Sequence, residues 1–537
     1  MADLLMFQGT GSHVGKSVLT TAFCRLLRRR GVRVAPFKGM NMSNNAWVTR
    51  DGGEIAIAQA AQARACGLEP TVEMNPVLLK TVSDQRCQVI VMGRPIGLFH
   101  AAELRSLCAQ LVEAIRGALR RMMDSHEFLV IEGAGSPAEV NLQETDLANM
   151  FVARSGGAPV ILVADIERGG VFAQIIGTME LLKPEDRERV RGFIINKFRG
   201  DPALLESGVR WLEERTGRPV LGVLPFFHDL RIPEEDALAE TLSSSRPQTG
   251  SNDIRRAEAD SDLRIEILRY PTISNFTDFE PLQREPGVRV EYMTEPPEGR
   301  APALIILPGS KSTVADLAWL RERGFDRYLE RRLKEGAQVL GVCGGFQMLG
   351  RRIYDPGRVE SEIPSVEGMG WLPTDTLFLP SKVTAQVKGI HLESGEKVSG
   401  YEIHAGRLQG ARRGRPVFRL TERSGAPVEE MDGCIHPELP VWGTYLHGLF
   451  DEPGYRRAFL RSLGRAASAG AVPGLILAPP TGHPVPHKAE PERDPYDDLA
   501  DRVQPHLRLE KALKPGASHH LRAVSAPAAG IGHWVPK

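Results

Sequence analysis

Short runs of consecutive apolar residues alternate along the first half of the chain with stretches in which apolar residues recur every three or four positions. The runs lie at residues 4–7, 128–131, 159–165, 192–198 and 219–226. A short apolar run is typical of a strand buried on both faces, and the longer spacing is typical of an amphipathic helix. Their regular alternation predicts a doubly wound parallel α/β sheet.

The pattern changes near the middle of the chain and again near its end. Residues 237–262 are rich in Ser, Pro, Gln and Asn and are too polar to form a core, so we expect a linker there. We expect a first domain over residues 1–236 and a second over residues 263–465. Residues 466–537 are Pro- and Ala-rich, and we expect them to form an extension with one helix near residues 496–513 and a disordered tail.

The first predicted strand is followed by a glycine-rich loop and then by apolar residues at helical spacing. Backbone N–H groups of such a loop bind phosphate oxygens, the lysine reaches the outer phosphates and the serine hydroxyl can bind Mg²⁺. Thr10 stands where the strict pattern has glycine. The nucleotide site that we predict comprises Thr10, Gly11, Ser12, His13, Val14, Gly15, Lys16 and Ser17.

Another predicted strand of the first domain ends in a carboxylate. The apolar run at residues 128–131 is followed by Glu132 and then by Gly133 and Gly135. The carboxyl end of a central strand is where an α/β sheet places metal and substrate chemistry. Glu132 is therefore a candidate ligand for a metal or a substrate.

In the second half of the chain, one cysteine lies between a short apolar run and a helical pattern. Cys343 is followed by Gly344 and Gly345, which permit a sharp turn from strand to helix. A helix N-terminus favours thiolate over thiol, so Cys343 is a candidate nucleophile. His447 follows a later short strand pattern and can reach Cys343 across the carboxyl edge of a parallel sheet. We predict that His447 is the base.

Composition narrows the class of protein. The chain has 67 basic and 67 acidic residues and a net charge of zero, so nothing favours nucleic acid. Its six cysteines show no CxxC spacing, which fits a reducing compartment and argues against structural zinc. No apolar run approaches the roughly 18 residues that span a bilayer, and the first residues lack the basic region of a signal peptide. We expect a cytoplasmic enzyme that binds neither nucleic acid nor membrane.

The surroundings of Cys343 and His447 resemble the class I glutamine amidotransferase domain, a flavodoxin-like α/β fold. The resemblance implies that the cysteine attacks the glutamine amide, forms a glutamyl thioester and releases ammonia. It implies an oxyanion and glutamine site at Gly309, Ser310 and Gly344. The family's third catalytic member is a glutamate two residues after the histidine, and here that position is Leu449. The group that orients His447, a backbone carbonyl or a carboxylate from elsewhere, stays open.

Motifs spread over roughly residues 4–455 resemble the cobyric acid synthase family, whose first domain is an ATP-dependent amidoligase related to dethiobiotin synthetase. The matching stretches are residues 41–43, 51–54, 75–80, 132–139, 165–173, 194–201 and 273–279. The resemblance implies ATP and Mg²⁺, and the metal ligands that it implies are Ser17, Glu54 and Glu132. Asp51 could compete with Glu54 for the metal. Asn196, at the end of its strand, is expected to face the adenine.

The same resemblance implies the reaction. The family amidates the b, d, e and g side-chain carboxylates of adenosylcobyrinic acid a,c-diamide to adenosylcobyric acid in cobalamin biosynthesis, with glutamine as ammonia donor to the corrinoid substrate. Two alternatives stay open: cobyrinic acid a,c-diamide synthase, which shares both domains but amidates the other two carboxylates, and another glutamine-dependent carboxylate amidoligase. A partitioning-type ATPase is disfavoured because it has no use for a glutaminase. The oligomeric state, the path of ammonia and the role of residues 401–404 stay open as well.

Overall fold

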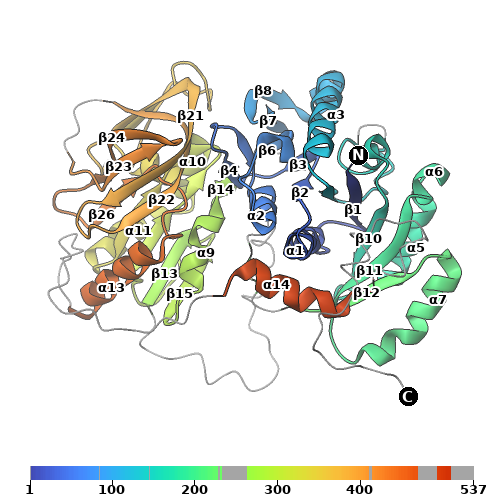
Figure 1. The fold of residues 1–537 in the computed structure, drawn as a ribbon. Coiled ribbons are helices and arrows are strands. Elements are labelled where there is room, and N and C mark those ends of the chain that lie inside the picture. Colours follow the sequence, from blue (N-terminus) through green and yellow to red (C-terminus); the bar gives the residue numbers. More distant parts are fainter. Residues whose placement is uncertain are drawn as a thin grey trace.

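The computed structural model describes residues 2–83, 85–143, 146–227, 230, 232, 263–409, 414–469 and 493–508. These residues form two α/β lobes that lie side by side (Figure 1). The expected linker at residues 237–262 and the expected tail that follows residue 513 lie outside the described residues.

Six strands form a parallel sheet in the N-terminal lobe, in the order β12-β11-β10-β1-β9-β2. The strands are β1 (Asp3–Gly9), β2 (Val34–Phe37), β9 (Phe128–Glu132), β10 (Val160–Asp165), β11 (Val190–Phe198) and β12 (Val220–Pro225). The larger helices are α1 (Lys16–Arg29), α2 (Ile57–Cys66), α3 (Cys108–Ser125), α4 (Met150–Gly156), α5 (Val171–Leu181) and α7 (Glu206–Thr216), and the short α6 spans Pro184–Arg187. The predicted doubly wound parallel sheet is confirmed.

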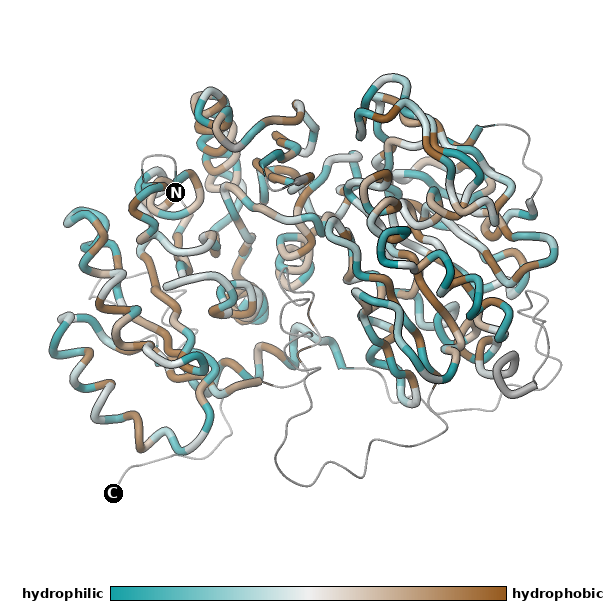
Figure 2. The backbone as a smooth tube through the Cα atoms, turned by 180° about the vertical axis from the view of Figure 1, so that it is seen from behind, coloured by the Kyte–Doolittle hydropathy of each residue, from teal (hydrophilic) through white to brown (hydrophobic). Residues whose placement is uncertain are grey.

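The central strand β1 shows why the strands of this lobe appear in the sequence as short apolar runs. Met6 and Phe7 are both fully buried, although neighbouring side chains of a strand point to opposite faces. Met6 packs in the core that includes Ile115 of α3, and Phe7 packs in the core that includes Phe23 of α1. Helices therefore cover both faces of the sheet, and the strands are apolar along the tube drawn in Figure 2.

A smaller sheet joins this lobe to its neighbour. Its order is β3-β6-β7-β8, formed by β3 (Met40–Met42), β6 (Val77–Ser83), β7 (Arg86–Val91) and β8 (Arg94–His100). A separate antiparallel pair, β4 (Ala46–Val48) and β5 (Glu54–Ala56), follows β3 in the chain. In Figure 1 the smaller sheet and β4 lie on the side of the lobe that faces the C-terminal lobe.

The C-terminal lobe contains a second α/β sheet in the order β15-β13-β16-β18-β26-β25, parallel except for the edge strand β25. Its strands are β13 (Leu263–Leu268), β15 (Val288–Met293), β16 (Leu304–Leu307), β18 (Gln338–Val342), β25 (Cys434–Ile435) and β26 (Val441–Thr444). Its helices are α9 (Glu280–Gln283), α10 (Thr313–Glu322), α11 (Phe325–Lys334), α12 (Gly344–Leu349) and α13 (Pro453–Ala469). The lobe is the second α/β domain that the sequence predicted.

A mostly antiparallel sheet completes the C-terminal lobe. It comprises β19 (Arg352–Tyr354), β20 (Ser365–Glu367), β21 (Asp375–His391), β22 (Lys397–Gln409), β23 (Phe418–Arg423) and β24 (Ala426–Asp432). The long strands β21 and β22 contact β4 of the N-terminal lobe. A two-stranded pair of β14 (Ile273–Ser274) and β17 (Gly309–Ser310) lies beside the parallel sheet. This second sheet thus reaches the other lobe.

The C-terminal helix α14 (Pro495–Val503) belongs to the N-terminal lobe rather than to the lobe that precedes it in sequence. Leu499 and Val503 are buried in the core cluster of α1, and Arg25 of α1 forms an ion pair of 2.7 Å with Asp497 (Figure 1). The expected helix end at residue 513 was wrong. A 3-10 turn replaces the α-helix at residues 504–506, where Pro505 lacks the N–H that would continue the helix.

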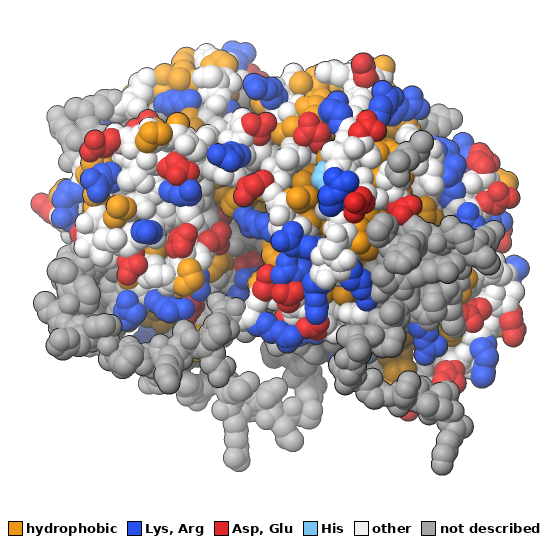
Figure 3. Space-filling model, in the orientation of Figure 1, with side chains coloured by type: hydrophobic (Ala, Val, Ile, Leu, Met, Phe, Trp, Pro, Cys, Tyr) orange, Lys and Arg blue, Asp and Glu red, His pale blue; other side chains and the backbone are white. Residues whose placement is uncertain are grey.

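Acidic and basic side chains are interspersed over the face of the molecule drawn in Figure 3. Such mixing agrees with the equal numbers of the two kinds in the sequence. Within the part of the chain that the structure describes, no helix combines the length and the apolar character needed to cross a bilayer.

Candidate active site

Cys343 stands at the turn between β18 and α12, as the sequence predicted. Its backbone has φ 50° and ψ −104°, a strained conformation for a residue with a side chain. The turn depends on Gly345, because a Cβ there would lie 1.9 Å from the carbonyl oxygen of Leu307. The thiol is thus held out of the sheet at a fixed place, which is the geometry of a nucleophile elbow.

His447 lies beside this thiol and is oriented by a carboxylate that the sequence did not identify. Its Nδ1 lies 2.7 Å from Oδ2 of Asp278, and the backbone N–H of Gly448 donates to Oδ1 of Asp278 at 3.0 Å. Both the imidazole and the carboxylate are buried. Burial lowers the pKa of His447, but Asp278 and a hydrogen bond with Cys343 raise it to about 10. The three side chains form a thiol–imidazole–carboxylate line.

Asp278, and not a residue at position 449, is the group that orients His447. Leu449 is 1% exposed and packs in the apolar core of its lobe, so it has no polar role. Asp278 sits in the 3-10 turn Phe276–Phe279, far from His447 in sequence. The orienting group is therefore a carboxylate from elsewhere, one of the two possibilities that the sequence left open.

Residues 401–404 support the catalytic imidazole. The Tyr401 ring stacks on the His447 ring with centroids 5.2 Å apart and planes at 15°. The Tyr401 hydroxyl accepts a 2.7 Å hydrogen bond from Asn275, which is buried. Backbone hydrogen bonds also join Tyr401 and His447 in both directions. Tyr401 therefore fixes the plane of the His447 ring, and Asp278 fixes the rotation of that ring within its plane.

The residues expected at the oxyanion site are brought together around Cys343. A Cβ on Gly344 would lie 2.8 Å from the backbone nitrogen of Ser310, and one on Gly309 would lie 3.1 Å from Cε1 of His447. The Ser310 hydroxyl donates to Asp316 at 2.5 Å, which anchors the turn. Close approach of these backbones requires glycine at both positions.

Cys343 opens into a cavity of about 360 Å³ that we call the thiol cavity. Both lobes line it, because Asn44, Lys80 and residues 95–98 come from the N-terminal lobe. Charged residues gather there: Lys80, Lys311, Glu360 and Lys382. Burial and the neighbouring lysines lower the pKa of Lys311 to about 7, and burial raises the pKa of Glu360 to about 7.

Glu54 was expected to bind metal with Ser17 and Glu132, but the structure places it at the junction of the lobes. Its carboxylate is fully buried and accepts from Nζ of Lys80 at 2.8 Å and Nζ of Lys382 at 2.6 Å. Burial raises the pKa of Glu54, but Lys382 and Lys80 outweigh burial and lower it to about 2. The carboxylate is thus engaged by two ammonium groups, one from each lobe.

Neighbouring contacts extend this junction. The Thr384 hydroxyl donates to the carbonyl oxygen of Gly52 at 2.6 Å, and the Gln386 amide donates to that of Val48 at 3.0 Å. Thr384 and Gln386 lie on β21, and their partners lie in and after β4. Asp51 lies in the same turn and interacts with Thr49. The motif at residues 51–54 therefore joins the lobes.

The predicted phosphate loop has the expected form. Gly15 has φ 96°, and a Cβ there would lie 2.1 Å from Nδ2 of Asn196. Nζ of Lys16 donates to the carbonyl oxygens of Gly11 at 2.8 Å and Gly135 at 3.2 Å. The lysine therefore lies folded over the loop at the place where a phosphate would bind.

Glu132 lies beneath this loop and is held by several donors. Its Oε1 accepts from Ser17 Oγ at 2.9 Å and Lys38 Nζ at 2.8 Å, and its Oε2 accepts from Gln62. Burial raises the pKa of Glu132, but Lys38 and the other donors outweigh burial and lower it below its usual range. Glu132 is therefore ionised and shares an oxygen with the loop serine.

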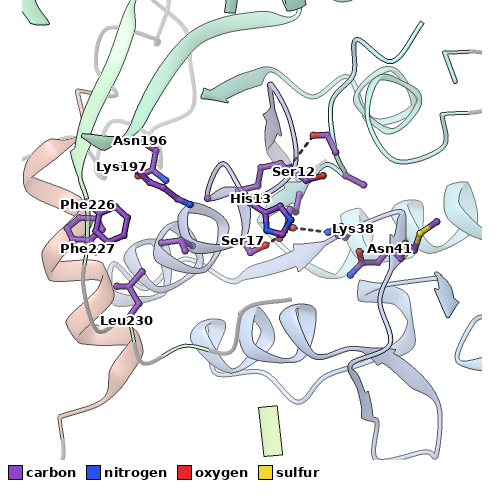
Figure 4. Close-up of a pocket in the computed structure, with 17 residues that line it drawn as sticks. Ser12, His13, Ser17, Lys38, Asn41, Asn196, Lys197, Phe226, Phe227 and Leu230 are labelled. Atoms are coloured by element: carbon purple, nitrogen blue, oxygen red, sulfur yellow. Dashed lines mark hydrogen bonds and ion pairs between the residues drawn. The ribbon is translucent and has the colours of Figure 1, made fainter. Parts of the chain in front are cut away.

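These groups face a cavity of about 340 Å³ that we call the P-loop cavity (Figure 4). Asn196, Phe226 and Leu230 lie at one side of it, and Lys38 and Asn41 lie at the other. Of the predicted nucleotide-site residues, those that line the cavity are Ser12, His13, Gly15, Lys16, Ser17 and Asn196. The others support the loop: Thr10 donates to Gln174, Gly11 accepts from Lys16 and Val14 accepts from Asn196.

Sequence reasoning missed three groups of this site. Lys38 directly follows β2, at the carboxyl end of a strand where α/β sheets place functional residues, and that position was a usable signal. Asp278 lies within the family motif at residues 273–279, but nothing local marks it as the partner of a histidine. Lys80 ends another motif and lines the thiol cavity together with residues of the other lobe, which only the packing of the two lobes could show.

A phosphate loop and a thiol–imidazole–carboxylate line in one chain define an ATP-dependent glutamine amidotransferase. Comparison with known proteins agrees. The CobQ/CobB/MinD/ParA nucleotide binding domain family matches residues 5–239, and the CobB/CobQ-like glutamine amidotransferase domain family matches residues 264–455.

Whole-length relatives specify the family further. The chain is 45% identical to a cobyric acid synthase of Roseiflexus castenholzii over 94% of this chain and 96% of that one. It is 47% identical to a cobyric acid synthase of Chloroflexus aurantiacus over 94% of this chain and 96% of the relative, and 46% identical to one of Sorangium cellulosum over 95% and 97%. The chain belongs to the cobyric acid synthase family, which confirms the resemblance drawn from its motifs.

Proposed function

We propose that the chain converts adenosylcobyrinic acid a,c-diamide to adenosylcobyric acid in cobalamin biosynthesis by amidating the b, d, e and g carboxylates. Glutamine supplies the ammonia and ATP activates each carboxylate. The observation that carries this proposal is the presence, in one chain of this family, of the Cys343–His447–Asp278 line and of a phosphate loop with Lys16.

In the thiol cavity, the Cys343 sulfur attacks the amide carbon of glutamine. His447 takes the thiol proton and returns it to the departing nitrogen, so ammonia leaves and a glutamyl thioester remains. Asp278 accepts the Nδ1 hydrogen and keeps Nε2 free for this transfer. Water then attacks the thioester, with His447 as base, and releases glutamate. Gly344 and the turn at Gly309 and Ser310 lie where the amide oxygen becomes negative.

Two charged side chains of the thiol cavity suit the α-amino and α-carboxylate groups of glutamine. The α-carboxylate of the substrate faces Lys311, and its α-ammonium group faces Glu360. These two side chains line the same cavity as the thiol. Both side chains are partly buried, and each carries the charge opposite to that of the substrate group it would face.

In the P-loop cavity, the corrinoid carboxylate attacks the γ-phosphorus of ATP. ADP leaves and an acyl phosphate remains, from which ammonia then displaces phosphate. Lys16 and Lys38 stabilise the charge that develops on the transferred group. Asn196, Phe226 and Leu230, at the opposite side of the cavity from Lys38, suit the adenine (Figure 4).

A magnesium ion fits this site. Ser17 Oγ and Glu132 Oε1 lie 2.9 Å apart at the cavity wall and are hard oxygen ligands. Among the described residues, no group of three or more His, Cys, Asp or Glu side chains forms a metal cage. Mg²⁺ in phosphoryl-transfer sites is held by one or two protein ligands and by the phosphates, so two suffice. The ion would neutralise phosphate charge there.

The proposal extends to the organisation of the chain. The bounds 1–236 for the amidoligase domain and 263–465 for the glutaminase domain are supported by the matched ranges 5–239 and 264–455. All six cysteines are free thiols, which suits a reducing compartment, so a cytoplasmic location stays our prediction.

Product mass with two nitrogen sources tests the proposal. With adenosylcobyrinic acid a,c-diamide, ATP and glutamine, we expect four successive amidations. Cys343→Ala should abolish amidation with glutamine but retain it with concentrated ammonium at alkaline pH. Lys16→Ala should abolish amidation with either donor, because no acyl phosphate forms. A product that carries only the a and c amides, made from cobyrinic acid, would instead identify the diamide synthase, and a glutamine-active Cys343→Ala enzyme would contradict the mechanism.

A further inference from the structure

A third cavity, which we call the apolar cavity, adjoins the P-loop cavity and plays no part in the steps above. It encloses about 790 Å³, the largest volume of the three. Four residues line both the apolar cavity and the P-loop cavity, so the two are continuous at the phosphate loop. These residues are Ser12, Met42, Ala134 and Gly135.

The walls of the apolar cavity are formed largely by aliphatic side chains. They come from the small sheet, from the 3-10 helix Ala101–Leu107, from α3 and from the segment after Glu132: Met40, Leu79, Leu104, Leu111 and Leu147. Polar side chains lie among them as well: Ser12, Arg105, Ser136, Glu139, Gln143, Asp146 and Asn149. A cavity of several hundred cubic ångströms with apolar walls and a few polar groups is typical of a site for an organic ligand.

Two large apolar side chains at this cavity are left in contact with water. Met42 is 61% exposed and Leu142 is 51% exposed, and both line the cavity. Exposed apolar groups that converge on a cavity mark a binding surface rather than a packing fault. They would be covered by a ligand that is broad and apolar.

We propose that the apolar cavity binds the corrin macrocycle of the substrate and directs one of its carboxylates to the phosphate loop. The assignment rests on the function proposed above. A corrinoid has a wide, largely apolar ring and carries its carboxylate arms at the rim, so it matches apolar walls that open onto a phosphate site. The shared residues Ser12 and Gly135 bring that rim to the end of the P-loop cavity where Lys16 lies.

The other two cavities suit this ligand less well. The P-loop cavity is occupied by the nucleotide in our mechanism, and the thiol cavity is bordered by Lys80, Lys311, Glu360 and Lys382. Aliphatic walls also hold a ring by contact area rather than by directional hydrogen bonds. The macrocycle can therefore turn between rounds, and one site can present four different carboxylates to the same phosphate.

Leu142→Asp tests the cavity by direct binding. Because Leu142 is half exposed, the substitution leaves the core intact, but it places a charge against the ring. Equilibrium dialysis with the coloured corrinoid should show Kd raised at least about tenfold, the scale of one lost aliphatic contact, while ATP binding is unchanged. Leu204→Asp is the matched control, since Leu204 is 81% exposed in the 3-10 turn Pro202–Leu205 of the same lobe. We expect it to bind corrinoid as the wild type does.

Cys108 provides a readout that needs no change in the cavity. It lines the apolar cavity and is the one cysteine of the six that is not buried. In a Cys343→Ala background, a thiol reagent should label Cys108, and the corrinoid should slow this labelling while ATP alone does not. Unchanged labelling at saturating corrinoid, or a wild-type Kd in Leu142→Asp, would overturn the assignment. If the wild-type enzyme amidated no corrinoid at all, the proposed function itself would fail instead.

Discussion

Replacing Asp278 with Asn isolates the group that orients the catalytic imidazole. The carboxylate uses both oxygens, since Oδ1 accepts from the Gly448 N–H at 3.0 Å and Oδ2 faces Nδ1 of His447 at 2.7 Å. Asparagine has only one acceptor oxygen. If the Gly448 N–H keeps that oxygen, the NH₂ group faces Nδ1, which must then accept. The hydrogen moves to Nε2, and the ring can no longer take the thiol proton.

The expected loss follows from these contacts. A buried hydrogen bond to a charged group contributes about 1.5–3 kcal/mol, and the upper end of this range corresponds to about 10²-fold in rate. Inversion of the tautomer in a comparable triad costs about 10⁴-fold. Both partners here are at most 5% exposed, so water cannot replace the carboxylate. We therefore expect kcat/KM for glutamine hydrolysis to fall about 10²- to 10⁴-fold in Asp278→Asn.

Two assays separate a lost imidazole orientation from a lost fold. Glutamate release measures hydrolysis, and corrinoid amidation with concentrated ammonium measures the untouched ligase site, which should keep its wild-type rate. The pH profile gives a further sign. His447 must be unprotonated to act as base, and Asp278 raises its pKa, so removing the charge should move the acid limb of kcat/KM to lower pH.

Asp432→Asn is the matched control. Asp432 is 5% exposed and accepts from the Thr444 hydroxyl on β26, the strand that leads to His447. It is thus an equally buried carboxylate in the same lobe, and its oxygens accept from the Thr444 hydroxyl and the backbone N–H of Tyr445. We expect its hydrolysis rate to stay within about threefold of wild type. A glutamine hydrolysis rate of Asp278→Asn within threefold of wild type would refute the role of Asp278 in the triad.

Three further predictions concern charge. Glu132→Gln should lower ATP-dependent amidation by about two orders of magnitude with either nitrogen donor and raise the Mg²⁺ concentration for half-maximal rate, and an unchanged Mg²⁺ titration would remove Glu132 from the metal site. Glu54→Gln should leave the Mg²⁺ titration unchanged but lower the free energy of unfolding by about 3–5 kcal/mol, since Lys80 and Lys382 lose their buried partner. A chemical-denaturation series measures this loss. A raised Mg²⁺ requirement would instead support Glu54 as a metal ligand. His391 is buried, and burial lowers its pKa from 6.5 to about 4. The unfolded chain therefore binds more protons between these pH values, so up to about 3 kcal/mol of stability is lost as pH falls from 6.5 through 4. His391→Gln should flatten the acid limb of the curve of unfolding free energy against pH. An unaltered acid limb would show that His391 does not cause this loss.

Local motifs of this chain could be predicted because their backbones allow few alternatives. The phosphate loop needs Gly15 at φ 96° against Asn196, and the elbow needs Gly345 against Leu307, so glycines at these spacings carry most of the geometry. The doubly wound sheet could be predicted as well, because a strand such as β1 is buried on both faces and shows an unbroken apolar run.

Long-range partners could not be predicted in the same way. Asp278 and His447 meet because two separate loops converge at one edge of the sheet. The sequence around each residue contains no signal that it contacts the other. Glu54 was assigned to metal because the family resemblance implies an acidic ligand at that position, yet two lysines from different lobes hold it. The helix of the extension ended early because Pro505 outweighed a helical pattern that continues beyond it.

The two active sites share a wall, which explains why one chain carries both domains. Strands β3 and β6 pair in parallel, with Met42 opposite Leu79. These two residues face the apolar cavity, whereas Asn44 and Lys80, one or two positions further along the same segments, line the thiol cavity. The glutaminase site is therefore not complete within its own domain, since part of its lining belongs to the amidoligase domain. Docking of the lobes through Glu54 completes this lining and, by the same two segments, sets the thiol cavity next to the apolar cavity.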